Sequence, residues 1–557
     1  MTEASSAAEP VRPPSPYPMH LKPASRYLMT KRGYLHPQKT YVWITLLIIG
    51  IMSLLYYVLG LSPNAQGSIP PGFAIGASDL YFHSIAIGVA ALGVYLVFMV
   101  FDLDKFEPPI DFPLSYRALT ATVIGAIGAF FYLRPVFNTE LAPIPLGLIL
   151  VGLILLADVG GALLVELYLL PAKMEGTYDP DTNRFGMIPR WSSLPSWKQF
   201  RKMDSTYWLT FVAVISAFIA GFMGFVSFWL NYFVIDIGAS PGLFSGYVAW
   251  LGGAQQFFST SYGSHSHEIV MAMLLGIVGV TARRFEVLNQ TGWKHTVAKV
   301  GMWVGVTGLL ALTTMFILEA FTTVFPNGVP PSLFGTTPGG QFTWYSYTNP
   351  NGMASDDTTM LWAALGGMVV LVPLLFTRAR GTPVWRDPVR AGILMTWIFA
   401  FIATPLEGFY IEFRESTLSG APQDLAFGNL QYFALIGIML ICMALLCIDF
   451  YVGERGVRTP TTAYAMLSVL IATVGGYLYV FLQWQQGTAG YWIFNVGFIL
   501  MDLFLLVAMV AVYRGVPEKY ANGDSVPQVR NNRNHRPPAT SDVGKTAPRG
   551  EGPQTGG

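Results

Sequence analysis

Apolar residues of this 557-residue chain form long, nearly uncharged runs that are separated by shorter polar stretches. The hydrocarbon core of a bilayer is about 30 Å thick, and a helix needs about 20 apolar residues to cross it. Twelve runs have this length, so the pattern predicts an all-α, polytopic membrane protein. The predicted spans are residues 41–61, 79–101, 116–136, 142–170, 207–235, 265–282, 299–324, 358–377, 391–410, 426–450, 461–485 and 489–513.

The positions of Lys and Arg predict how these spans are oriented. Loops on the cytoplasmic side of a membrane carry most of the basic residues. If the N-terminus is cytoplasmic, only Arg134 and Arg414 among the 33 basic residues fall on the outer side. A count shifted by one helix would reverse every later loop and would lose this asymmetry. We therefore expect both termini to lie in the cytoplasm.

The segments outside the spans divide into tails and outer loops. Residues 1–40 and 515–557 are rich in Pro and polar side chains, which cannot bury enough apolar surface to fold. We predict disordered cytoplasmic tails there, around a transmembrane domain at 41–513. Residues 325–357 contain no Lys or Arg and are predicted to form an outer loop. Residues 236–264 are interpreted as an outer-surface or re-entrant helix, because backbone at membrane depth needs protein partners.

Composition excludes several classes of protein. The chain is 53% apolar and 12% charged, whereas soluble domains carry about 25% charged residues. The net charge of +1 gives no support for nucleic-acid binding. The two cysteines, Cys442 and Cys447, lie in one apolar run without C-x-x-C spacing, which argues against a disulfide scaffold or a thiolate zinc site.

Three of the seven histidines lie near the predicted outer membrane surface. His83 opens the second span, and His265 and His267 open the sixth. Both spans run from outside to inside, so the three residues are expected at similar depth. A neutral imidazole is a ligand for iron, copper or zinc. Two imidazoles from different helices could hold a heme, one on each face of its iron.

The spacing of His265 and His267 limits this site. Residues two apart on an α-helix point about 200° away from each other, so only one of them could share a partner with His83. If the chain is still extended over 263–267, all three could form a copper or zinc site, with Glu268 nearby. In a third interpretation they bind no metal, and hydrogen bond to lipid headgroups, backbone or water.

Carboxylates within the predicted spans are a second set of candidates, because a buried charge in a membrane usually faces a polar interior. Asp158 lies in the middle of the fourth span, and Glu166 follows two turns later on a nearby face. This pair is a candidate relay for protons or a path for a solute. Glu319 and Glu407 are candidates for an outer polar region. Asp449 lies near a cytoplasmic end, where we expect its side chain to reach water.

Twelve spans, cytoplasmic termini and histidines at the outer ends of the second and sixth spans together resemble subunit I of the heme-copper oxidase superfamily. That family forms a pseudo-threefold bundle with ligands on its second, sixth and tenth helices, and the resemblance implies a heme ligand at His83. His265-Ser266-His267 is similar to the family's H-x-H heme segment, which belongs to the tenth helix there. The chain lacks the family's H-x-x-x-Y pattern on the sixth helix and His-His pair on the seventh. The resemblance therefore does not extend to a dioxygen-reducing centre.

These features predict a membrane redox protein of a respiratory electron-transfer chain, located in the plasma membrane of a prokaryote. It would bind a b-type heme, or alternatively copper or zinc, without being a full oxygen reductase. It would pass electrons between an outer-surface cytochrome or copper protein and a quinone or another membrane subunit. Two alternatives stay open: a secondary transporter of a small solute that uses its buried carboxylates, and a non-catalytic anchor subunit of a redox complex.

Overall fold

The computed structural model describes most of the predicted spans. It covers residues 37–58, 77–101, 103, 114–132, 143–178, 184–185, 188–189, 194–230, 254–324, 355–379, 382–398, 400–401, 439–450 and 489–514. Most of these residues are helical, which agrees with the predicted fold class. Most of both predicted tails and most of the predicted outer segments lie outside the described residues.

Long helices dominate the described chain. They are α1 (Pro37–Val58), α3 (Ala77–Val100), α4 (Leu114–Tyr132), α5 (Pro143–Met174), α7 (Ser205–Leu230), α9 (Ala254–Arg284), α10 (Trp293–Val324), α11 (Ser355–Leu375) and α15 (Ala489–Arg514). Residues 388–398 and 439–450 are also helical.

Short elements connect these helices. The chain between α5 and α7 holds α6 (Trp197–Phe200) and an antiparallel ladder of β1 (Arg184–Phe185) with β2 (Ile188–Pro189). The 3-10 turn η4 (Val287–Asn289) links α9 to α10. A second ladder, β3 (Arg378–Ala379) with β4 (Thr382–Pro383), and the turn η6 (Val384–Arg386) follow α11.

Length and composition make this an α-helical protein of the membrane type. Within the described ranges, five helices contain stretches that are long and apolar enough to cross a bilayer, namely α3, α4, α5, α7 and α10. Shorter apolar stretches lie in α1, α11, α15 and 439–450. The predicted total of twelve spans remains a prediction.

One boundary differs in a way that matters for the site. Hydropathy predicts that the sixth span begins at residue 265, but α9 is already helical from Ala254. Polar residues such as Gln255 and Ser259 lower the hydropathy of this stretch without interrupting a helix, since their helix propensity is ordinary. Residues 254–264 are therefore helical and continuous with α9, which agrees with a helix in this part of the predicted outer segment.

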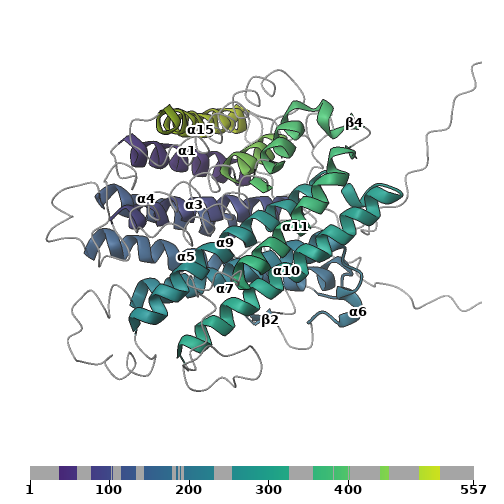
Figure 1. Ribbon diagram of the computed structural model, residues 1–557, viewed down its shortest axis with the longest axis horizontal. Coiled ribbons are helices and arrows are strands. Elements are labelled where there is room, and N and C mark those ends of the chain that lie inside the picture. The colour runs from purple at the N-terminus through teal and green to yellow at the C-terminus, as the bar shows by residue number, and fades with distance from the viewer. Residues whose placement is uncertain are drawn as a thin grey trace, which may run out of the picture.

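The helices pack in neighbouring pairs. α1 contacts α15, α3 and α4 contact each other and α5, α7 contacts α9, and α10 contacts α11. In Figure 1, α1, α3, α4, α5 and α15 run across the view, and α7, α9, α10 and α11 run obliquely to them. Contacts of α5 with α7 and of α3 with α9 join the two groups.

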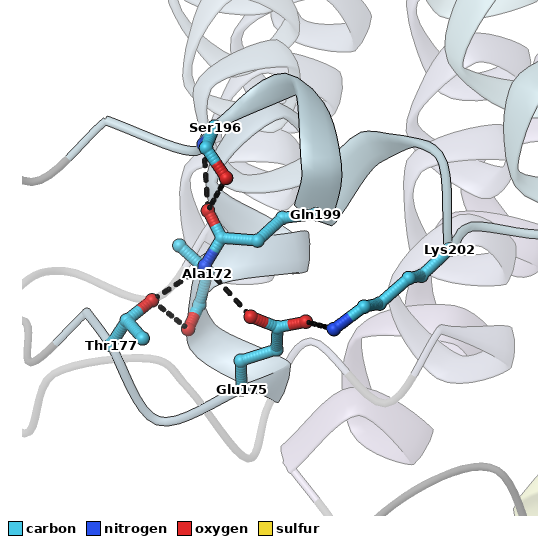
Figure 2. Close-up of polar contacts among 6 residues, drawn as sticks. All are labelled: Ala172, Glu175, Thr177, Ser196, Gln199 and Lys202. Carbon is cyan, nitrogen blue, oxygen red and sulfur yellow. Dashed lines mark hydrogen bonds and ion pairs between the residues drawn. The ribbon is translucent and has the colours of Figure 1, made fainter.

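The junction between α5 and α7 is fixed by a polar network (Figure 2). The Gln199 side-chain amide donates to the Glu175 carboxylate at 3.1 Å and to the Thr177 hydroxyl at 2.8 Å. Lys202 Nζ lies 2.5 Å from the other Glu175 oxygen. The Ser196 backbone N–H donates to Gln199 Oε1 at 2.6 Å and so caps α6. These contacts join the end of α5 to the start of α7.

Candidate functional site

His83 occupies the first turns of α3 and is partly buried. The next residue, Ser84, is fully buried, and its Cα lies near Gly125 of α4. His83 therefore lies next to a residue of the packed α3–α4 interface and is itself partly exposed. This position is compatible with a heme or metal ligand, and that role remains a prediction.

His265 and His267 both lie within the helical backbone of α9. Their side chains lie outside the described residues, as do the side chain of Glu319 and the whole of Glu407. Because the chain is helical at 263–267, the two positions are separated by about 200° around the helix axis. The backbone therefore does not have the extended form that a joint site of His83, His265 and His267 required. Pairing of His83 with one of them remains the prediction.

A contact at the other end of the two helices sets their relative register. The Arg283 guanidinium, in the last turn of α9, lies 4.4 Å from the centre of the Phe101 ring, which directly follows α3. Phe101 follows His83 by 18 residues, and Arg283 follows His265 by 18. Eighteen residues make five full turns and rise about 27 Å. Each of positions 83 and 265 therefore lies five turns from this contact along its own helix, on the face of that helix that carries Phe101 or Arg283.

Position 267 belongs to a different face of α9. Thr281 follows His267 by 14 residues, which is close to four full turns. The Thr281 hydroxyl accepts a hydrogen bond from Trp397 Nε1 at 3.3 Å, so this face turns toward residues 388–401. Of the two α9 histidines, His265 is the one whose position matches that of His83.

Asp158 and Glu166 each have a cationic partner. Arg117 of α4 donates through Nε to Asp158 Oδ2 at 2.9 Å, and Lys173 pairs with Glu166 within α5. The Lys173 side chain is almost completely buried, and its ammonium also lies 5.6 Å from the Tyr178 ring. Sequence reasoning identified both carboxylates but neither cation. Their role in moving protons or solute remains a prediction.

Glu268 is a buried carboxyl that sequence reasoning noted only as a neighbour of the histidines. It is fully buried in α9, and neither oxygen has a hydrogen-bond partner within the described part of the chain. Two hydroxyls lie on the adjoining helices, Ser216 of α7 and Thr313 of α10, hydrogen bonded to each other at 2.7 Å. In the sequence, the feature that could have identified Glu268 as a site residue is its position directly after the His-Ser-His motif.

Asp449 does not reach water, contrary to the prediction. Its carboxylate is fully buried and accepts from Arg284 Nε at 2.7 Å and Arg390 Nε at 3.2 Å. Arg284 Nη2 also donates to the Asp449 backbone carbonyl at 3.1 Å. Helix α9 and residues 388–398 cover the end of helix 439–450. The Asp449 carboxylate therefore contacts arginines and not solvent.

Among the described side chains, no group of three or more His, Cys, Asp or Glu could hold a metal ion. The side chains of His265 and His267 are not among them. Cys442 and Cys447 are both buried thiols without a disulfide. Ligation of a heme or metal by His83 together with His265 or His267 remains a prediction. In comparisons with protein-family models, curated proteins and solved structures, nothing matches this chain.

Proposed function

We propose that this protein is an integral membrane redox protein that binds a heme between α3 and α9. His83 and His265 would hold its iron. The observation that supports this most strongly is the shared register: both histidines lie five turns outward from the Arg283–Phe101 contact. Two imidazoles at one level on two helices are the donor set of a six-coordinate heme iron.

The residues around the pair have defined tasks in this proposal. The imidazoles hold and orient the macrocycle, and the buried faces of α3 and α9 exclude water from it. The bound heme would supply one-electron transfer. Two histidine ligands would suit the heme to electron transfer and not to dioxygen reduction, which agrees with the missing copper-site patterns. A b-type heme fits this donor set best, and copper or zinc is the alternative occupant.

The proposal includes a place in the cell. Twelve spans with cytoplasmic termini, in an oxidase-like bundle in the plasma membrane of a prokaryote, would put the histidines beneath the outer surface. The electron donor would be an outer-surface cytochrome or copper protein, and the acceptor a quinone or a second membrane subunit. The distribution of basic residues supports this orientation.

An absorption spectrum with metal analysis tests the proposal. The full chain, purified from its native membrane, should show a heme Soret band and about one iron per chain. His83→Ala should lose both, and His295→Ala is the matched control, since its ring Nδ1 lies 2.9 Å from the Leu288 carbonyl in the connection after α9. A colourless wild-type protein without bound metal would refute the proposal. A colourless protein that copurifies with a cytochrome would instead support the anchor-subunit alternative.

One observation favours the transporter alternative. Glu268 is a buried carboxyl close to the Thr313 hydroxyl of α10, which is itself hydrogen bonded to Ser216 of α7. Carboxyls of this kind often bind a coupling cation in membrane carriers. Solute uptake in vesicles that is lost in Glu268→Gln and in Asp158→Asn, without any bound heme, would establish this alternative.

A further inference from the structure

We propose that the outer face of α4 and α5 is where a second copy of this chain docks, through the Arg117–Asp158 pair. This inference does not depend on the proposed function. Asp158 is joined to Arg117 by an ion pair, yet 48% of its side chain is exposed. An exposed carboxylate is ordinary in water but costly within the hydrocarbon core, so the depth of Asp158 in the membrane matters.

Neighbouring contacts give the depth of Asp158. A Cβ on Gly152 of α5 would lie 3.0 Å from Ile87 of α3, so residues 152 and 87 are level. Farther along, Tyr207 donates to the Leu167 carbonyl and packs against Phe101, so α5 and α3 run in the same direction. Asp158 follows Gly152 by six residues, about 9 Å, so it lies within the span of the apolar stretch His83–Val100 of α3 and level with the first turn of α4, where Arg117 contacts it.

A regular seam leads to this carboxylate. Residues of α5 spaced alternately three and four apart face outward, as at the a and d positions of a coiled coil: Ile144, Gly147, Val151, Ile154 and Asp158. No described atom lies within 4 Å of a Cβ built on Gly147, so a neighbouring helix could approach closely here. Beyond Asp158, α7 covers α5, and Phe218 lies 3.2 Å from a Cβ built on Gly160.

The charge of Asp158 indicates whether lipid or protein covers the outer face of α4 and α5. Apolar residues of the seam are stable against lipid tails, but a half-exposed carboxylate inside the apolar stretch Gly147–Met174 of α5 is costly there. This face is therefore covered by protein at the level of Asp158. A polar residue at one seam position is also the feature that fixes register between packed helices.

Charge complementarity identifies the partner as a second copy. A two-fold axis along the membrane normal leaves every residue at its own depth, and Arg117 and Asp158 already share one depth because they are in contact. Arg117 of each copy would then meet Asp158 of the other, and four alternating charges would close a ring. The face is self-complementary in this way without any group from another protein.

Cysteine cross-linking in native membranes tests the dimer. The protein's own Cys442 and Cys447 are buried and will not interfere. Val151→Cys and Ile154→Cys should each give a disulfide-linked dimer under copper–phenanthroline oxidation. Leu365→Cys on α11 and Val496→Cys on α15 are exposed controls on other helices. We expect at least about fivefold more dimer from the seam positions than from the controls.

Exchanging the charges tests the partner contact itself. In the Val151→Cys background, Asp158→Arg should abolish cross-linking because it puts four cations together, and adding Arg117→Asp should restore it. Equal cross-linking at seam and control positions, no dimer, or a cross-link to a different polypeptide would each overturn the proposal.

Discussion

The carboxylate of Asp449 joins three helical segments through two arginines. Arg284 ends α9, Arg390 lies in 388–398, and both donate to this fully buried group. Removing one member of a buried ion pair leaves uncompensated charge, which typically costs about 3–5 kcal/mol. We therefore expect Asp449→Ala to lower the stability of the detergent-solubilised protein by about this amount, measured by heat or denaturant unfolding.

The control for Asp449→Ala is Arg386→Ala. Arg386 is exposed and contacts the Trp385 ring, so its loss should change stability by no more than about 0.5 kcal/mol. Equal effects of the two substitutions would contradict the role given to Asp449.

Glu175 makes the α5–α7 junction dependent on pH. Hydrogen bonds from Lys202 and then Gln199 lower the pKa of its carboxyl below the usual value of 4.5. Because the folded pKa is below the unfolded one, the stabilisation is fully present above pH 4.5 and is lost as pH falls through the lowered pKa. Glu175→Gln should therefore lower the melting temperature at pH 7 and lower it much less at an acidic pH below the lowered pKa. A deficit that is the same at both pH values would contradict this account.

Sequence reasoning at the scale of single residues found carboxylates more readily than their environments. Asp158, Glu166 and Asp449 were recognisable because each interrupts an apolar run. Their partners Arg117, Lys173 and Arg390 were not, since a partner is set by helix packing and not by spacing along the chain. The burial of Glu268 close to Thr313 depends on packing in the same way.

At the scale of elements, glycines let α10 and α11 touch backbone to backbone. A Cβ on Gly366 would lie 2.2 Å from the Gly305 nitrogen, and a Cβ on Gly308 would lie 2.5 Å from the Ala363 nitrogen. Backbone atoms cannot move aside as a side chain can. Gly366→Ala should force the helices apart and destabilise the protein by at least about 1–3 kcal/mol, measured by heat unfolding.

Gly93→Ala on α3 is the matched control, because no described atom lies within 4 Å of a Cβ built there. In the middle of a helix this substitution should stabilise the protein by about 0.5–1 kcal/mol. If Gly366→Ala is also neutral or stabilising, the close packing of α10 on α11 is wrong.

Hydropathy predicted the helices well but their ends less well. Apolar runs gave α3, α4, α5, α7 and α10 because lipid demands length and low charge. The early start of α9 was missed, since a helix continues through polar residues that hydropathy scores as an end. The early start of α9 matters for the histidines. Because the backbone is helical there, positions 265 and 267 point in nearly opposite directions around the helix axis.

At the scale of the whole molecule, the predicted orientation has a direct test. A cysteine substituted for Lys294, in the first turn of α10, should react with a membrane-impermeant maleimide only from the cytoplasmic side. A cysteine in the predicted outer loop, such as Thr343→Cys, should react only from outside. The reverse pattern, or labelling of both from one side, would contradict the twelve-span topology with cytoplasmic termini.

The central claim is that His83 and His265 share one bound group while His267 faces elsewhere. The measurement that tests it most directly is the heme spectrum of four alanine variants prepared side by side, at His83, His265, His267 and His295. The account predicts that the Soret band disappears in His83→Ala and His265→Ala and persists in the other two. A band that survives His265→Ala, or that is lost in His267→Ala, would contradict it.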